Sequence, residues 1–255
     1  MSLLEVKNLH TYFKTKKGIV KAVNDVTYSL DAGKTLGIVG ESGSGKSVSA
    51  MSIIKLLDGN GYIESGSITF DGKDILQCTD KEMYHIRGNE ISVIFQEPMT
   101  SLNPVFTVER QIGETLQIHQ NMTKKEARKK AVDLLADVKI PNPERVAKQY
   151  PFQLSGGMRQ RVMIAMALAC KPKLLIADEP TTALDVTIQA QIMDLLAEIK
   201  HDTNTAIILI THDLGVVAQN CEYVSVIYAG EIVESGTVHD VFKKQMHPYT
   251  EGLFS

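Results

Sequence analysis

The feature that most constrains this chain is a glycine-rich octapeptide, GESGSGKS, at residues 40–47. A short apolar run at 35–39 comes directly before it, and a helical pattern of apolar residues follows at 46–57. A strand, a glycine turn and a helix in this order open an α/β unit, in which the helix packs back onto a sheet. Because glycine has no Cβ, the backbone of such a turn can also wrap closely around an anion. We therefore expect an α/β fold with an anion-binding loop at 40–47.

The octapeptide matches the pattern G-x-x-x-x-G-K-[ST], whose chemistry suits nucleotide phosphates. Its backbone N–H groups can cradle phosphate oxygens, Lys46 can reach the β- and γ-phosphates, and the Ser47 hydroxyl can bind Mg²⁺. The following helix directs its positive N-terminal end at the same anion. A structural glycine turn would share part of this pattern, but the strand before it and the helix after it favour a phosphate loop. The residues that we expect to hold the nucleotide here are Gly40, Glu41, Ser42, Gly43, Ser44, Gly45, Lys46, Ser47 and Val48.

Two acidic residues end a second apolar run, in the sequence LLIADE at 174–179. An apolar strand that ends in two acids places them at the carboxyl edge of a parallel sheet, where α/β proteins bind ligands. Asp178 would hold Mg²⁺, largely through water, and Glu179 would polarise the attacking water as a general base. An exposed acidic turn is the alternative for this segment taken alone. Beside the phosphate loop, it indicates a P-loop nucleoside triphosphatase.

Apolar periodicity along the rest of the chain predicts an α/β core that carries a helical insert. Strand signals stop between about 104 and 150, where helix-like segments follow one another. We expect one domain over 1–255. Its core, with an antiparallel β part, occupies 1–103 and 171–255, and the helical insert occupies about 104–170.

The same periodicity predicts the individual elements. Thr-x-x-Glu boxes, which are typical of helix starts, occur at 79–82 and 123–126. A closing hairpin is expected to turn at Ala229-Gly230. The expected strands are 3–13, 20–30, 35–39, 67–70, 91–95, 174–177, 206–210, 224–228 and 231–234. The expected helices are 46–57, 108–119, 124–138, 156–169, 186–200 and 214–218.

Composition argues against several other classes of protein. The 27 Lys and Arg stand against 30 Asp and Glu, so the chain lacks the basic excess typical of duplex binding, and we expect no nucleic-acid partner. Cys78, Cys170 and Cys221 form no CxxC pair, which argues against a disulfide framework or zinc site and favours a reducing cytoplasm. The start lacks a signal-peptide pattern, and the longest apolar run, 162–170, is about half of a membrane span. A membrane connection would therefore come through another subunit.

The segment LSGGMRQ at 154–160 identifies the family that the chain resembles. It is similar to the signature motif of ABC-family ATPases, usually LSGGQ, with Met158 in place of the glutamine. Ser155 can cap the helix that starts beside it, and bare glycine N–H groups at a helix end suit a terminal phosphate. The resemblance implies that Ser155, Gly156 and Gly157 act in trans, on ATP held by a partner chain.

Further elements of the family follow in the expected order. Gln96 resembles the Q-loop glutamine that touches Mg²⁺ and water, and the sequence ALD ending at Asp185 resembles the D-loop. His212, after a predicted strand, resembles the switch histidine that contacts the γ-phosphate. Phe13 stands at the place of the aromatic residue that stacks on adenine, with Tyr12 as the competing candidate. The resemblance thus implies Glu179, His212 and Gln96 as the catalytic residues.

Longer segments narrow the resemblance to one group of importers. FQEPMTSLNP at 95–104, the stretch 150–169 and DEPTTALDVTIQAQI at 178–192 look like the ATPases of oligopeptide, dipeptide and nickel importers. The sequence HPYT at 247–250 also resembles that group, whose members normally continue past it, so the chain resembles a shortened or naturally short member. The cysteine-bearing tail that binds an iron–sulfur cluster in some relatives is absent from these residues, and we expect no cluster.

The resemblance implies an ATP-binding and ATP-hydrolysing subunit of an ABC importer, with ATP and Mg²⁺ as cofactors. Closure of an ATPase dimer would drive the uptake of peptides, with a nickel or metal-chelate importer as the alternative. The implied partners are a second, identical or homologous ATPase subunit, two membrane-spanning permease subunits and an external substrate-binding protein. The chain would lie peripherally at the cytoplasmic face of the membrane, and a groove near Gln96 and the insert would receive a permease helix.

Two other classes of function compete with this interpretation. A soluble ABC ATPase that acts on ribosomes or DNA usually joins two cassettes or carries a long coiled coil, and these 255 residues have neither. A nucleotide-binding regulator without turnover would not need both Glu179 and His212.

Overall fold

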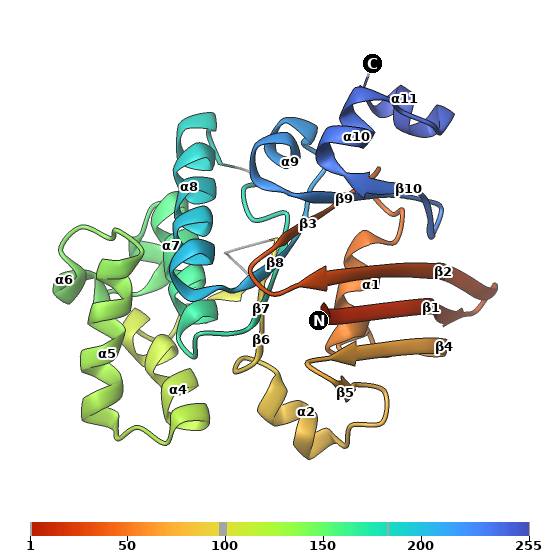
Figure 1. The fold of residues 1–255 in the computed structure, drawn as a ribbon. Helices are drawn as coiled ribbons and strands as arrows, with labels where there is room; N and C mark the ends of the chain where they lie inside the picture. The colour runs from red at the N-terminus through yellow and green to blue at the C-terminus, as the bar shows by residue number, and fades with distance from the viewer. Residues whose placement is uncertain (1, 97–100, 183, 255) are drawn as a thin grey trace. The chain divides into compact units, whose positions relative to one another are not determined.

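The computed structural model describes residues 2–96, 101–182 and 184–254 (Figure 1). The chain divides into two compact units. The first comprises Met1–Tyr84 and Asn204–Ser255, and the second comprises His85–Thr203. The predicted helical insert at 104–170 falls within the second unit, and the assignment of 1–255 as a single domain stays a prediction.

An antiparallel sheet forms one part of the first unit. Its strands run in the order β2-β1-β4-β5, and both of the strands predicted near the N-terminus are confirmed. Alternate residues of β1, such as Leu4 and Val6, are fully buried, as expected for a strand with one face against the core. The strands are β1 (Ser2–Thr15), β2 (Gly18–Asp31), β4 (Gly61–Phe70) and β5 (Lys73–Asp74).

Parallel strands form the second part of the first unit. β3 pairs in parallel with both β8 and β9, and β10 pairs antiparallel with β9. All residues of β3 and β8 are buried, which explains why they read as continuous apolar runs without alternation. The predicted hairpin turn is confirmed, because Ala229 and Gly230 both have positive φ, as a tight two-residue turn requires. The strands are β3 (Thr35–Val39), β8 (Ala206–Ile210), β9 (Tyr223–Tyr228) and β10 (Glu231–Thr237).

The helices of the first unit include two that sequence periodicity did not predict, α10 and α11. They are short, and only a few of their residues are fully buried. The helices are α1 (Lys46–Ile53), α9 (Leu214–Asn220), α10 (Val238–Lys243) and α11 (Pro248–Phe254), and α2 (Asp80–Ile86) spans the boundary between the units.

The predicted extent of the first helix, 46–57, is wrong at its C-terminal end. α1 stops at Ile53, and Lys55 takes a left-handed φ of 51°. The Leu56 N–H donates to the Met51 carbonyl at 3.0 Å and the Lys55 N–H to the Ser52 carbonyl at 3.1 Å. This pair of bonds is the Schellman pattern that closes helices, here with a lysine where glycine is usual. The apolar residues beyond Ile53 therefore belong to the exit turn.

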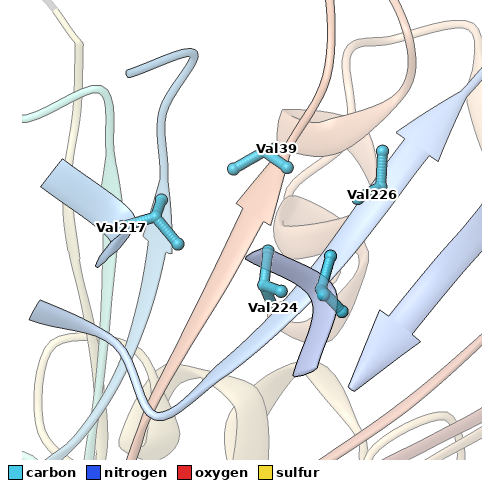
Figure 2. Packing of buried hydrophobic residues seen from close by; sticks show 5 residues of the cluster. Val39, Val217, Val224 and Val226 are labelled. Carbon is cyan, nitrogen blue, oxygen red and sulfur yellow. The ribbon is translucent and has the colours of Figure 1, made fainter. Parts of the chain in front are cut away.

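A cluster of five valines holds several elements of the first unit together (Figure 2). The valine cluster draws one residue from β3, one from α9, two from β9 and one from α10, and the chain turns from β3 into the glycine loop at Val39. Its members are Val39, Val217, Val224, Val226 and Val241. The end of β3 is therefore fixed by apolar packing directly before the loop begins.

The second unit contains two parallel strands and most of the long helices. β6 pairs with β7, and the Thr-x-x-Glu box at the start of α5 is confirmed, as is the one at the start of α2 in the first unit. Among the described residues, no helix is both long and apolar enough to cross a membrane. The elements are β6 (Ile91–Ile94), β7 (Leu174–Asp178), α4 (Val108–Gln120), α5 (Lys124–Asp137), α6 (Pro143–Ala147), the 3₁₀ turn Pro151–Gln153, α7 (Gly156–Leu168) and α8 (Val186–Thr203).

Candidate nucleotide-binding and hydrolysis site

The glycine loop at 40–47 lies in the first unit, between the end of β3 and the start of α1, as the sequence predicts. Gly40 and Gly45 have φ values of 148° and 104°, which side chains rarely tolerate. A Cβ at Gly40 would overlap the carbonyl oxygen of Ile227, and a Cβ at Gly45 would overlap that of Ala22. Both positions therefore require glycine for close packing as well as for backbone conformation.

Lys46 is the first residue of α1, and its side chain folds back over the loop. The residue is only 5% exposed, and its Nζ donates to the carbonyls of Gly40 and Glu41, each at 2.8 Å. A buried ammonium beside the positive end of a helix creates a strong local attraction for an anion. The Ser44 hydroxyl is also buried, and it has no hydrogen-bond partner among the described residues. A ligand oxygen would satisfy this group, which fits a phosphate in the loop.

The acidic pair stands at the carboxyl end of β7 in the second unit. Asp178, the last residue of the strand, is 8% exposed, and Glu179 follows with a left-handed φ of 46°. A non-glycine residue in this region stores strain of about 1 kcal/mol, and such strain collects at functional sites. Two groups donate to Oε2 of Glu179, Nε2 of Gln96 at 3.0 Å and Oγ1 of Thr182 at 2.8 Å. The structure thus brings together the predicted residues Gln96 and Glu179.

Sequence reasoning missed Thr182. The residue lies three positions after Glu179, and its N–H also donates to the Glu179 carbonyl at 3.2 Å. A turn of this kind places a hydroxyl on its fourth residue beside the side chain of its first. The signal was present in the segment EPTT, because threonine is one of the residues that can close such a turn through its side chain.

The predicted metal-binding residues supply donors that suit Mg²⁺. This ion prefers oxygen ligands in a compact octahedral arrangement, commonly one or two from the protein and others from phosphates and water. Asp178 contributes a nearly buried carboxylate and Ser47 a hydroxyl. The Gln96 amide directs its nitrogen at Glu179, so its oxygen is turned away from that carboxylate. Each of these residues therefore carries an oxygen of the kind that Mg²⁺ prefers.

The segment that resembles the family signature begins α7 in the second unit. The Ser155 hydroxyl caps the helix by accepting from the Met158 N–H at 3.4 Å, so the predicted cap is confirmed. Ser155 and Gly156 are exposed, whereas a Cβ at Gly157 would lie 2.9 Å from Cγ2 of Ile188 on α8. Gly157 is therefore needed for close packing of two helices. The N-terminal end of α7 presents its first residues to solvent.

Asp185, the predicted D-loop residue, comes directly before α8. Its Oδ1 accepts from the Ile188 N–H at 3.0 Å, which caps the helix. Ala183 of the same motif lies outside the described residues.

His212 and the aromatic pair lie in the first unit. His212 follows β8 and is exposed. Phe13 is half-buried and contacts the backbone at Gly61, where a Cβ would lie 2.8 Å from its Cε1. The Tyr12 ring packs edge-on against Tyr62 with centroids 6.3 Å apart. Tyr12 thus has an intramolecular ring partner.

Comparison with known proteins identifies the family. The family model described as "ABC transporter" matches residues 23–182. The oligopeptide transport ATP-binding protein OppD of Escherichia coli is 57% identical over 254 residues, which cover 100% of this chain and 75% of that protein. AppD, the oligopeptide transport ATP-binding protein of Bacillus subtilis, is 55% identical over 255 residues, covering 100% and 78%.

A solved structure agrees with this result. The ATP-binding cassette MJ0796, in a dimeric post-hydrolysis state bound to ADP and phosphate, has a TM-score of 0.82 and 30% identity, over 92% of this chain and 98% of that one. The predicted α/β fold of an ABC nucleotide-binding domain is therefore confirmed. The family match, the relatives and this fold together show that the chain belongs to the ABC transporter family and is one of its ATP-binding, ATP-hydrolysing proteins.

Proposed function

We propose that this chain powers the uptake of oligopeptides or dipeptides as the ATPase subunit of an importer. The observation that carries the proposal is the identity of 55–57% to oligopeptide and dipeptide transport ATP-binding proteins across nearly the whole chain. Identity at this level over the whole of this chain favours a peptide cargo over nickel or a metal chelate, and a transporter over a soluble ATPase.

In this proposal the loop at 40–47 holds the phosphates of ATP, and Lys46 turns from the loop carbonyls to the β- and γ-phosphates. Ser47, Gln96 and Asp178 would hold Mg²⁺, which would neutralise phosphate charge when bound. Glu179 accepts a proton from the attacking water. Its orientation is supported by the bonds that Gln96 and Thr182 donate to one of its oxygens. His212 contacts the γ-phosphate, and Phe13 stacks on the adenine.

The site is completed by a second ATPase subunit, identical or homologous. Ser155, Gly156 and Gly157 would close over the γ-phosphate held by the partner, with Asp185 at the same interface. The exposed N-terminal end of α7 supports this role, because a helix start offers N–H groups and a positive dipole to an anion. The dimeric state of the similar cassette MJ0796 supports it as well.

A groove in the second unit is the proposed seat of a helix from a membrane-spanning permease subunit. It encloses about 650 Å³, and α4 and the segment before it supply much of its lining. Val105 is 69% exposed, and Tyr150, also in the lining, stacks on Phe152 with ring centroids 5.6 Å apart. Exposed apolar and aromatic side chains that gather at a groove are typical of a protein interface. Two permeases, an external binding protein and a peripheral position at the cytoplasmic face complete the proposed importer.

The proposal is tested by transport in cells that lack this chain but retain its permeases. We expect wild type to restore ATP-dependent uptake of a labelled tetrapeptide, of a labelled dipeptide, or of both. Lys46→Ala should restore neither. Labelled nickel, measured in parallel, should enter at the same rate with and without the chain. Nickel uptake that depends on Lys46, without peptide uptake, would show that the cargo is nickel and not a peptide. If neither peptide nor nickel were taken up, and if ATP turnover depended on added ribosomes or DNA, the transport role itself would be contradicted.

A further inference from the structure

The phosphate loop is tied to the C-terminal helix by one hydrogen bond. The backbone N–H of Glu41, the second residue of the loop, donates to the Tyr249 hydroxyl of α11 at 2.9 Å. The carbonyl of the same residue accepts from Lys46 Nζ at 2.8 Å. Glu41 is therefore held through both of its backbone polar groups, by Tyr249 on one and by the phosphate-binding lysine on the other. A continuous chain of contacts leads from α11 to Lys46.

The backbone around Tyr249 is fixed by polar contacts within the first unit. The carboxylate of Glu234 on β10 accepts from the Met246 N–H at 2.9 Å and from the His247 N–H at 3.1 Å. The Tyr249 N–H in turn donates to Nδ1 of His247 at 3.1 Å. These bonds set the point at which α11 begins, and with it the direction of the tyrosine.

Apolar packing fixes the ring itself. Tyr249 packs on Tyr228 of β9 with centroids 4.4 Å apart, and together with Leu253 it packs against the valine cluster of Figure 2. That cluster includes Val39, the residue from which β3 enters the loop. Burial raises the pKa of Tyr249, so the hydroxyl stays neutral at physiological pH. A rigid, neutral oxygen is thereby placed against the loop.

We propose that Tyr249 is a positioning residue for the phosphate loop, and that the turn at 247–250 thereby sets the affinity of the chain for ATP. The inference rests on the proposed role of the loop in ATP binding. When Lys46 turns toward the phosphates, its bonds to the carbonyls of Gly40 and Glu41 weaken. The bond from Glu41 to Tyr249 then remains as a restraint on that end of the loop, together with the bond that the Ser44 N–H donates to the Glu41 carbonyl at 3.2 Å. The bond from Glu41 to Tyr249 therefore stabilises the nucleotide-bound state more than the empty state.

The experiment compares Tyr249→Phe with Tyr228→Phe in the full chain. The first variant keeps the ring and removes the oxygen that binds Glu41, and the second removes a hydroxyl from the other ring of the same pair. Competition against a fluorescent ATP analogue gives the Kd of ATP and of inorganic triphosphate, which lacks the adenine. Thermal unfolding without nucleotide reports whether the fold is kept. Lys46→Ala in the same assay reports whether the loop is the binding site.

For Tyr249→Phe we expect both Kd values to rise by the same factor, about 2- to 10-fold, which is the range for one neutral hydrogen bond. Its unfolding midpoint without nucleotide should stay within about 3 °C of wild type. Tyr228→Phe should change neither quantity. Unchanged affinity in Tyr249→Phe, or an equal loss in Tyr228→Phe, would overturn the positioning role while leaving the loop assignment intact. ATP affinity that is insensitive to Lys46→Ala would overturn both.

Discussion

Replacing Glu179 by glutamine is the most direct test of the hydrolytic chemistry. The change keeps the length of the side chain and an oxygen that can still accept from Gln96 and Thr182, which now contact Oε2 at 3.0 and 2.8 Å. Neither residue at this position is glycine, so the backbone strain at φ 46° is the same in both proteins. The substitution therefore removes proton acceptance and little else.

The size of the effect follows from the role of the base. A positioned general base contributes about 10²- to 10⁴-fold to the rate, which corresponds to about 3–5 kcal/mol in the activation free energy. We expect kcat to fall by that factor. The Kd of ATP with Mg²⁺ should stay within about threefold of wild type, because the phosphate loop is untouched.

Phosphate release under saturating ATP measures kcat, and equilibrium binding measures Kd. Thr182→Val is the matched control, since it removes one donor to the carboxylate and leaves the base. The loss of one such bond should reduce kcat by about 10-fold, the low end for a hydrogen bond to a charged group, because the bond from Gln96 to the same oxygen remains. Turnover of Glu179→Gln within about threefold of wild type would remove this residue from the role of base. If kcat fell further in Thr182→Val than in Glu179→Gln, the positioning of this loop would contribute more to the rate than proton acceptance by Glu179.

Three further results are expected. Phe13→Ala should raise the KM for ATP more than Tyr12→Ala does, because neighbours in a strand face opposite ways and only one can stack on the base; the reverse order would show a register error of one residue. Burial would raise the pKa of Glu234, but the nearby Thr250 side chain and the hydrogen bonds that the Met246 and His247 N–H groups donate outweigh it and hold the pKa below its usual value. The lowered pKa of Glu234 stabilises the folded state at pH values above the unfolded pKa of about 4.3, and this stability is lost as the pH falls through the folded pKa. The unfolding midpoints of wild type and Glu234→Gln should therefore differ most at pH 7 and converge in acid. Finally, hydrolysis by the isolated chain should rise faster than linearly with its concentration while dimers are scarce.

Much of the fold follows from local patterns in the sequence. The run at 35–39 and the run at 206–210 are bounded by polar and turn residues on both sides, and the structure places β3 and β8 at those same positions. The capping boxes at 79–82 and 123–126 were equally informative, since a threonine and a glutamate satisfy one another's backbone groups within four residues. Signals of this kind are complete within one short segment, and they need no knowledge of the rest of the chain.

The missed features depend on distant contacts. β4 begins at Gly61, six residues before the expected start, because the segment GYIESG pairs with β1 while burying few side chains and so shows no alternation. α11 is held by Glu234 on β10 and by the valine cluster, and its own seven residues carry little apolar periodicity. The bond from Glu41 to Tyr249 joins residues 208 positions apart. No local pattern encodes such a pairing.

The candidate site shows the same division between local and distant information. The phosphate loop, Gln96, Glu179 and His212 were predicted as separate elements, and the structure adds the bond between Gln96 and Glu179. The assignment of each residue to ATP, Mg²⁺ or the partner chain stays a prediction, and the variants above test the assignments of Lys46, Glu179 and Phe13.

A shared site would explain why the chain carries both a phosphate loop and a signature segment at the exposed N-terminal end of α7. If Ser155 of one chain closes on the phosphate held by Lys46 of another, a chain with Lys46→Ala and a chain with Ser155→Arg are each inactive alone. A mixed dimer of the two keeps one intact site, formed by the unaltered lysine of the second chain and the unaltered serine of the first. Random pairing gives half mixed dimers with one working site of two, so we expect about a quarter of wild-type hydrolysis. Strict alternation between sites would suppress this rescue, so the decisive result is a different one. Full activity from a monomer, linear in concentration and indifferent to Ser155→Arg, would refute the shared site.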